Sequence, residues 1–225
     1  KLRSYFEREK FEYAGAAGGF IDKYGYPFCR GRIFQHIETD HGQYNDAVEI
    51  FWATGACMFV RAELYKQFGG FDEDFFAHME EIDFCWRLKN GGYKIMYCPD
   101  SVVYHVGGGT LPKKSSQKTY LNFRNNISLL YKNLPAKLVL PVFAVRFPLD
   151  AVAAFKFLLD GGFGDFYAVL RAHLYFYSHF RMLNFKRKQF AKSMVHGIYK
   201  RNLVKEYYVN NKTLFTQLDP EHFEK

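Results

Sequence analysis

The segment 71–110 constrains this chain of 225 residues more than any other part of its sequence. It places two groups of carboxylates, a Trp-Arg pair, a lone histidine and a glycine run in one order. The paired glycines just before it supply the positive φ that a helix stop and a sharp turn require. A short helix over 62–68 is therefore predicted to end where this segment begins.

A second helix is predicted to begin at the acidic group Glu80, Glu81 and Asp83, and to end at 90–92, where the sequence reads Asn-Gly-Gly. Carboxylates are favourable at a helix N-terminus because the helix macrodipole is positive there. Asp83 and Arg87 are four residues apart and can pair across one helical turn. At least one of the acidic residues therefore has a purely structural use.

Two short strands are predicted over 93–98 and 102–106, and the glycine run 107–109 follows them. His105 lies near the end of the second strand. In one interpretation the whole segment is a pocket rim, in which a carboxylate acts as a general base and the neutral imidazole binds a metal. In the other it is an acidic helix start beside a core histidine, and spacing alone favours this structural interpretation.

The ordered series GGFDEDFF, MEEIDFCWR, GYKI, a strand ending in Tyr-His, and GGG resembles the C-terminal half of an inverting family 2 glycosyltransferase. The similarity is greatest to the bacterial rhamnosyltransferase-like branch that builds cell-surface glycans. The resemblance extends over 1–135 and is densest over 52–110. It implies an α/β, GT-A (Rossmann-like) domain. It also implies transfer of a sugar, with inversion, from a nucleotide-diphosphate-sugar to a hydroxyl of a lipid-linked or cell-surface polysaccharide acceptor.

The resemblance implies a role for each matching position. Glu81 would be the general base, with Glu80 as the other member of the acidic pair. Asp83 would be either a support that acts through Arg87 or the base itself. His105 would complete a site for a divalent metal, Mg or Mn, which is the expected cofactor. The positions that the resemblance assigns to substrate binding are Trp52, Thr54, Gly55, Ala56, Arg87, Arg124 and Asn125.

Two groups of these binding residues have a structural alternative. The segment 52–56 matches a strand that lines the sugar pocket, where small residues let a sugar approach the backbone; a buried strand with a bulge fits the sequence as well. Arg124 and Asn125 lie on an amphipathic helix predicted over 117–133. The resemblance implies that both side chains contact the donor diphosphate. An equally good interpretation is that they are ordinary polar residues of the protein surface.

The nucleotide-binding half of the family, which ends in an Asp-x-Asp motif, has no counterpart in this sequence. No G-x-G-x-x-G turn or P-loop replaces it. The nearest look-alike is Glu-Thr-Asp at 38–40, and His36, Glu38, Asp40 and His41 form either a separate metal cluster or, more simply, a solvated loop. We therefore expect a chain that begins mid-sequence and lacks most nucleotide contacts. A non-catalytic acceptor- or membrane-binding module is the alternative function.

Composition divides the chain into 1–134, expected to be the acceptor and metal part of the catalytic domain, and 135–225, expected to be an amphipathic, basic helical extension. The segment 138–159 is apolar but contains two prolines and three charged residues. These residues argue against a membrane-spanning helix and predict two short interfacial helices. A helix over 165–183 and a polar tail over 210–225 are expected to follow, and 1–50 is expected to be rich in loops.

The formal charge of +8 and the aromatic content of 20% favour an anionic partner. Aromatic residues beside the basic run at 184–188 favour an anionic membrane surface. No RNA-binding strand pattern accompanies them, so nucleic acid is not an expected partner. Four cysteines without C-x-x-C spacing indicate neither a zinc site nor a redox motif. The expected location is cytoplasmic, on the inner face of the bacterial cell membrane.

Overall fold

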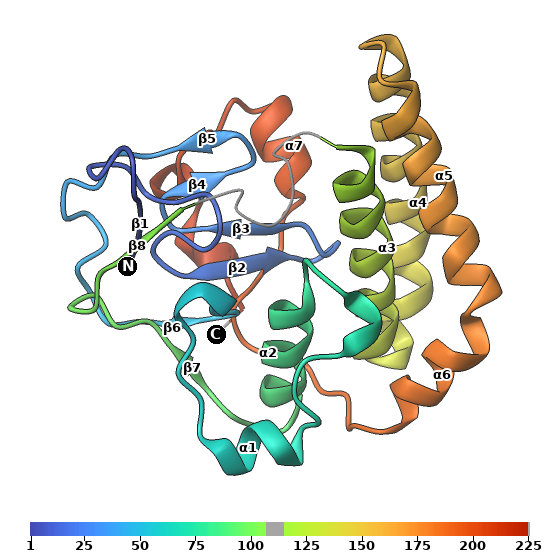
Figure 1. Cartoon of the computed structure of the whole chain (residues 1–225), viewed down its shortest axis with the longest axis horizontal. Coiled ribbons are helices and arrows are strands. Elements are labelled where there is room, and N and C mark those ends of the chain that lie inside the picture. The colour runs from blue at the N-terminus through green and yellow to red at the C-terminus, as the bar shows by residue number, and fades with distance from the viewer. Residues whose placement is uncertain (107–114, 225) are drawn as a thin grey trace. The chain divides into compact units, whose positions relative to one another are not determined.

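The computed structural model describes residues 1–106 and 115–224, and the glycine run 107–109 lies outside them. The fold is mixed α/β, with short strands followed by longer C-terminal helices (Figure 1). Contacts divide the described chain into two compact units. We call them the sheet unit (1–70, 92–106 and 195–224) and the helical unit (71–91 and 115–194).

These two units differ from the consecutive segments expected from composition. The predicted acidic helix groups with the C-terminal helices, and the C-terminal residues group with the strands. Residues 195–224 contain a strand and short turns besides one short helix, so the chain after residue 134 is not a helical extension throughout.

The sheet unit contains nine short strands: β1 (Leu2–Ser4), β2 (Gly19–Asp22), β3 (Pro27–Cys29), β4 (Arg32–Ile33), β5 (His36–Ile37), β6 (Glu49–Ile50), β7 (Ile95–Met96), β8 (Val103–His105) and β9 (Ile198–Tyr199). Its helices are α1 (Ala62–Gln67) and α7 (Leu203–Tyr208), with 3-10 turns η1 (Gly55–Cys57), η3 (Phe215–Gln217) and η4 (Pro220–His222).

Five strands form the main sheet of this unit in the order β5-β4-β3-β2-β9, and the first four are stacked in Figure 1. Neighbours pair antiparallel, except that β9 pairs parallel to β2. The expectation of a loop-rich 1–50 is confirmed, since most of its residues lie in turns and irregular segments, but this segment also supplies four of the five strands. Strands of two to four residues are too short to show the alternation by which a strand is recognised in a sequence.

The two strands predicted beside His105 are present, but both are shorter than expected. β7 pairs antiparallel with β6, and β8 pairs parallel with β1. Each therefore joins a strand from the first fifty residues. The helix stop predicted after α1 is also confirmed, because Gly69 and Gly70, which follow this helix, have φ of 73° and 61°.

The prediction of a polar tail over 210–225 was wrong. Phe215 and Phe223 pack their rings against Phe20 of β2, each with a centroid separation of 5.3 Å. Tyr199 of β9, which is fully buried, packs on Phe223. The aromatic side chains of the C-terminal segment thus form part of the core of the sheet unit.

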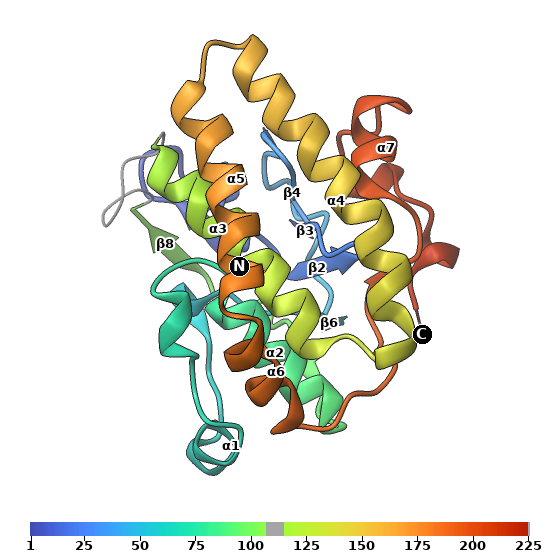
Figure 2. The same ribbon diagram turned by 90° about the vertical axis from the view of Figure 1, so that its right-hand side faces the viewer.

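The helical unit contains η2 (Glu73–Phe75), α2 (Glu80–Asn90), α3 (Ser116–Asn133), α4 (Ala136–Leu159), α5 (Phe163–Ser178) and α6 (Phe180–Lys188). α3 contacts α2, α5 and α6, and α4 contacts α5 (Figure 2). The helices predicted at the acidic group and over 117–133 are confirmed as α2 and α3, as is α1 in the sheet unit. The helix predicted over 165–183 is divided at His179 into α5 and α6.

α4 corrects the prediction of two short interfacial helices. It is one helix of 24 residues that contains Pro141 and Pro148. Two of the charges that argued for separate helices lie inside the unit: Arg146 pairs with Asp150 at 2.7 Å, and both side chains are buried. His173 of α5 approaches the same carboxylate at 3.2 Å. By length and composition alone, α4 is long and apolar enough to cross a membrane.

Candidate functional site

The acidic group opens α2, as predicted. Glu80, Glu81 and Asp83 all lie in its first turn, where the positive end of the helix dipole favours negative charge. Glu80 and Glu81 are half-buried, whereas Asp83 is fully buried. Burial raises the pKa of the Glu80 carboxyl, and its buried Oε2 accepts no hydrogen bond. A partly desolvated carboxylate is a stronger base than a solvated one, and the catalytic role of the pair stays a prediction.

Asp83, two residues after Glu81, lies in a network of buried charges. Its carboxylate accepts hydrogen bonds from Arg87 Nε at 2.9 Å, Lys132 Nζ at 2.9 Å and Asn133 Nδ2 at 2.7 Å. The predicted pairing with Arg87 is thus present. Arg87, which the family resemblance assigned to substrate binding, has a side chain only 4% exposed. These partners favour a supporting role for both residues, although their part in catalysis stays a prediction.

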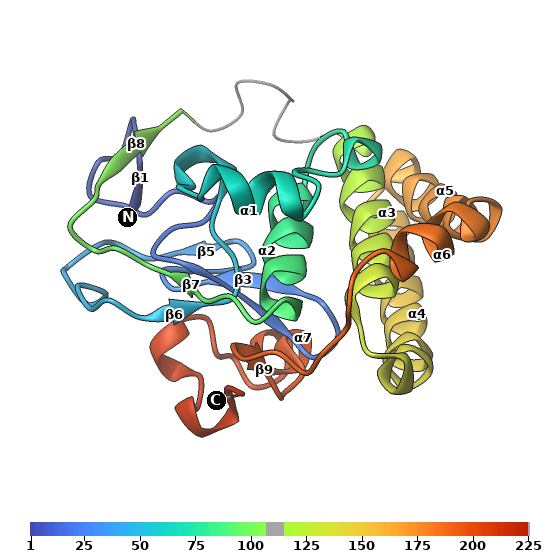
Figure 3. The same cartoon turned by 90° about the horizontal axis from the view of Figure 1, so that it is seen from below.

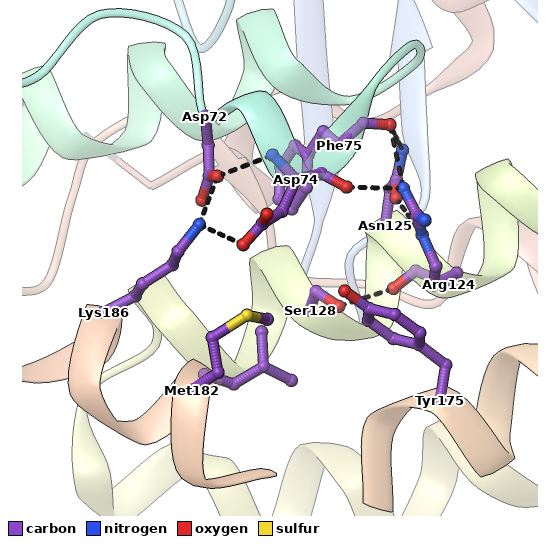
Figure 4. Close-up of a pocket in the computed structure, with 10 residues that line it drawn as sticks. Asp72, Asp74, Phe75, Arg124, Asn125, Ser128, Tyr175, Met182 and Lys186 are labelled. Carbon is purple, nitrogen blue, oxygen red and sulfur yellow. Dashed lines mark hydrogen bonds and ion pairs between the residues drawn. The ribbon is translucent and has the colours of Figure 1, made fainter. Parts of the chain in front are cut away.

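The network extends to the start of the loop that precedes α2. Lys132 also donates to Asp72 at 2.5 Å, and Lys186 of α6 donates to both Asp72 and Asp74 (Figure 4). Burial would raise the pKa of Asp72, but the two ammonium groups outweigh it and bring this pKa to about 2. The loop is therefore bound electrostatically to α3 and α6.

The backbone of the loop 74–79 has an unusual course. Phe76, His78 and Met79 have φ of 61°, 70° and 72°, and none of them is glycine. L-residues rarely adopt positive φ, which costs about 1–3 kcal/mol at each residue. Such a course persists only where the surroundings hold it.

Two neighbouring side chains of α3 hold this backbone. Asn125 Nδ2 donates to the carbonyls of Phe75, Ala77 and His78 at 2.9, 2.8 and 2.7 Å. Arg124 donates through one terminal nitrogen to the carbonyls of Asp74 and Phe75 at 2.7 and 2.9 Å (Figure 4). Asn125 is fully buried, so the surface-polarity explanation was wrong for this residue. The predicted contact of this pair with a diphosphate is untested.

His78 is a candidate that the sequence interpretation missed. Its Nε2 is buried and makes no hydrogen bond, and burial, followed by the charge of Lys118, lowers the pKa of its imidazole. Lys132 and Lys186 were missed as well, because lysines on amphipathic helices normally face solvent. The sequence did carry a signal for them. The polar residues of α3 at positions 125, 126, 132 and 133 recur about two helical turns apart, which places them on one face of the helix.

The residues predicted to line a sugar pocket lie in the sheet unit, but they do not form a strand. β6 ends at Ile50, and Thr54 caps the 3-10 turn η1 by accepting from the Ala56 amide at 3.3 Å. Gly55 and Ala56 are exposed in this turn. Trp52 is buried, and its indole donates to the Phe20 carbonyl at 2.9 Å. The strand prediction was therefore wrong here, while the sugar-binding role stays a prediction.

His105 ends β8 in the sheet unit, whereas Glu80 and Glu81 belong to the helical unit. Its Nδ1 is buried without a hydrogen-bond partner, as a ligand nitrogen awaiting a metal would be. Within 1–106 and 115–224, no group of three or more His, Cys, Asp or Glu side chains is arranged to hold a metal ion. A single imidazole nitrogen does not by itself make a metal site, so the role of His105 as a metal ligand stays a prediction.

The acidic residues at 38–40 are engaged with the protein. Asp40 binds Arg3 at 2.6 Å and Lys1 at 3.2 Å, and its side chain is buried. Glu38 accepts from the Tyr44 hydroxyl at 2.9 Å and from the Phe215 amide at 3.1 Å. These contacts give both carboxylates a structural role within the sheet unit. The prediction that they belong to a solvated loop was therefore wrong for Glu38 and Asp40.

Comparison with known proteins shows which family part of the chain resembles. Residues 27–125 match the family described as "Glycosyltransferase like family 2". This part of the chain is therefore similar to glycosyltransferase family 2. It includes α2 and the start of α3, and the resemblance inferred from the sequence is confirmed at the level of this family.

Three curated relatives share parts of the sequence. An N-acetylglucosaminyl-diphospho-decaprenol L-rhamnosyltransferase of Mycobacterium tuberculosis is 41% identical over 54 residues, covering 24% of this chain and 18% of the relative. The low-salt glycan biosynthesis hexosyltransferase Agl10 of Haloferax volcanii is 31% identical over 105 residues, or 44% and 34%. The dTDP-rhamnosyl transferase RfbF of Shigella flexneri is 27% identical over 147 residues, or 59% and 48%.

These matches span less than half the length of each relative. No solved structure shows significant similarity to the chain.

Proposed function

We propose that this chain is the acceptor-side part of an inverting glycosyltransferase. It would transfer a rhamnosyl or hexosyl unit from a nucleotide-diphosphate-sugar to a hydroxyl of a lipid-linked or cell-surface polysaccharide acceptor. The observation that carries the proposal is the half-buried Glu80–Glu81 pair at the start of α2, within a family 2 segment. The names of the relatives, two rhamnosyltransferases and one hexosyltransferase, support the sugar class.

Glu81 is the proposed general base. The acceptor oxygen attacks the anomeric carbon, the bond from that carbon to the diphosphate breaks on the opposite face, and the hydroxyl proton passes to the Glu81 carboxylate. Glu80 is the member of the pair that burial pushes toward the neutral form. A protonated Glu80 would leave Glu81 as the charged member of the pair, at a helix start where the macrodipole stabilises negative charge.

A divalent metal, Mg or Mn, is the proposed cofactor, with His105 as its protein ligand. When bound, it would neutralise charge on the departing diphosphate. The unpartnered, buried Nδ1 of His105 supports this assignment. Arg87 and Asp83 would keep the glutamates in place from behind, and Trp52 with the 54–56 turn would contribute to the sugar side.

A cytoplasmic membrane surface is the proposed location. α4 and α5 pack against each other (Figure 3), and each has exposed apolar side chains at helical spacing. The large exposed side chains are Leu140, Val152, Phe155 and Leu159 on α4, and Phe163, Tyr167, Leu170, Leu174 and Tyr177 on α5. Exposed basic residues accompany them: Lys137, Lys156, Arg171, Arg181 and Lys188. Apolar side chains flanked by basic ones match an anionic bilayer surface.

Binding to vesicles tests this location. Phe155→Asp combined with Leu170→Asp should weaken sedimentation with phosphatidylglycerol vesicles at least about tenfold, since two charges would enter the apolar interface. Phe59→Asp is the matched control, because Phe59 is 94% exposed and lies in the sheet unit. Equal losses in both variants, or none in either, would contradict the assignment of this face.

The reaction is tested on the native full-length protein with a panel of nucleotide-diphosphate-sugars and a polyprenyl-diphosphate-linked acceptor. We expect release of the nucleoside diphosphate together with a labelled, extended acceptor, and loss of both on chelation with EDTA. Metal-independent transfer would refute the cofactor assignment alone. Vesicle binding without transfer from any donor would instead favour the non-catalytic module, for which the exposed face of α4 and α5 is the specific support.

A further inference from the structure

The loop 74–79 leads directly into the first turn of α2, so its course determines where Glu80 and Glu81 lie. Three of its residues have positive φ without being glycine. Without other contacts, L-residues would relax from such conformations. Whatever holds the loop therefore contributes to the position of the glutamates.

Arg124 and Asn125 supply this hold from α3. Together they donate five hydrogen bonds to the loop, two from Arg124 and three from Asn125, and these reach four carbonyls. Asn125 Oδ1 in turn accepts from Arg124 Nε at 2.8 Å. This bond fixes the amide orientation, because a flipped amide would place its oxygen against three carbonyl oxygens.

A side-chain contact reinforces the backbone hold. Lys186 of α6 lies between the carboxylates of Asp72 and Asp74, at the beginning of the loop (Figure 4). The loop is thus held at its backbone by α3, while α6 binds Asp74 at its start and Asp72 just before it. Both helices belong to the same compact unit as α2.

We propose that Arg124 and Asn125 act as a clamp that holds the loop 74–79 and thereby positions Glu80 and Glu81 for proton transfer. They are positioning residues in this account, in place of the diphosphate contact that the family resemblance implies for them. The inference rests on the proposed function, because the clamp matters for catalysis only if the glutamates carry it.

Steady-state kinetics on the full-length protein separate the two roles. Asn125→Ala should lower kcat on the order of 10- to 100-fold, since a small displacement of a catalytic group has effects of this size, and leave the donor KM within about threefold. Arg124→Gln keeps a neutral donor for the carbonyls and removes the charge. The clamp predicts a kcat loss smaller than that of Asn125→Ala, whereas a diphosphate contact predicts a large rise in donor KM.

Thr119→Val is the matched control. Thr119 lies earlier on α3, and its hydroxyl donates to Asp165 at 2.6 Å, so the variant removes a hydrogen bond of the same unit without touching the loop. It should leave kcat unchanged within about twofold.

Hydrogen exchange supplies a readout that needs no activity. The amides of Phe76 and Ala77 donate within the loop, to the carbonyls of Glu73 and Phe75. Both should exchange faster in Asn125→Ala than in the wild type or in Thr119→Val. Faster exchange in Asn125→Ala would show that Asn125 holds the loop. If the wild type at the same time had no transferase activity, the proposed function would be refuted while the contact itself would stand. Unchanged exchange with unchanged kcat, or a rise in donor KM alone, would overturn the clamp. Arg124→Gln gives the same decision if Asn125→Ala does not fold.

Discussion

Replacement of Asp83 by alanine should destabilise the helical unit far more than an exposed helix charge pair can. Asp83 is fully buried and accepts hydrogen bonds from Arg87, Lys132 and Asn133. The variant would leave two buried cations without this carboxylate. Lys132 would keep its contact with Asp72, whereas Arg87 would lose an ion pair of 2.9 Å.

Removal of one partner from a buried ion pair costs about 3–5 kcal/mol, because the remaining charge stays desolvated. Lys156 and Asp160 provide the matched comparison, since they also stand at i and i+4 but have side chains 63% and 60% exposed. Loss of such an exposed pair changes stability by about 0.5 kcal/mol or less. The predicted ratio between Asp83→Ala and Lys156→Ala is therefore about sixfold or more.

Urea unfolding followed by tryptophan fluorescence measures both variants. The chain has two tryptophans, Trp52 in the sheet unit and Trp86 on α2. In a Trp52→Phe background, the emission of Trp86 reports on the helical unit alone, and a shift of the midpoint at constant slope gives the change in free energy. A cost below about 1 kcal/mol for Asp83→Ala would refute the interpretation of this network as a buried charge cluster.

Three further predictions concern stability. Lysine contacts hold the pKa of Asp72 at about 2, below its ordinary value, so the stabilisation that they give is present above about pH 4 and is lost as the pH falls toward 2. It amounts to roughly 1–2 kcal/mol, and Asp72→Asn should remove this pH dependence from urea titrations. Burial raises the pKa of Glu80, so its ionisation opposes folding as the pH rises; Glu80→Gln should be more stable than the wild type at pH 8, and a less stable variant would contradict this. Gly19→Ala should cost about 1–3 kcal/mol in thermal unfolding, since its methyl group would lie 2.1 Å from the Trp52 ring, whereas Gly55→Ala, with no atom within 4 Å of the new methyl group, should be neutral.

The helices around the candidate site could be predicted from the sequence because their signals are local. The paired glycines after α1, the carboxylates at the start of α2 and the apolar spacing of α3 each depend on residues within a turn or two of one another. The family resemblance was equally local, since its motifs follow one another in order along 52–110.

The missed features depend on contacts between distant segments. β9 joins β2 from the other end of the chain, and pairing of this kind leaves no mark in the sequence of a two-residue strand. Pro141 and Pro148 predicted a helix break, yet packing against α5 and the buried Arg146–Asp150 pair accompany a continuous α4. Asn125 looked like a surface residue because its partners are carbonyls about fifty positions earlier. Tertiary contacts override local preference at each of these places.

The central claim is that the start of α2 supplies the catalytic base, and a comparison of Glu81→Gln with Glu80→Gln in the full-length protein tests it most directly. Transfer from the donor identified in the sugar screen would be measured at saturating donor and acceptor, with donor binding measured separately. We predict that Glu81→Gln lowers kcat by on the order of 10² to 10⁴ without weakening donor binding, and that Glu80→Gln has the smaller effect. Turnover of Glu81→Gln near that of the wild type would show that the base lies elsewhere.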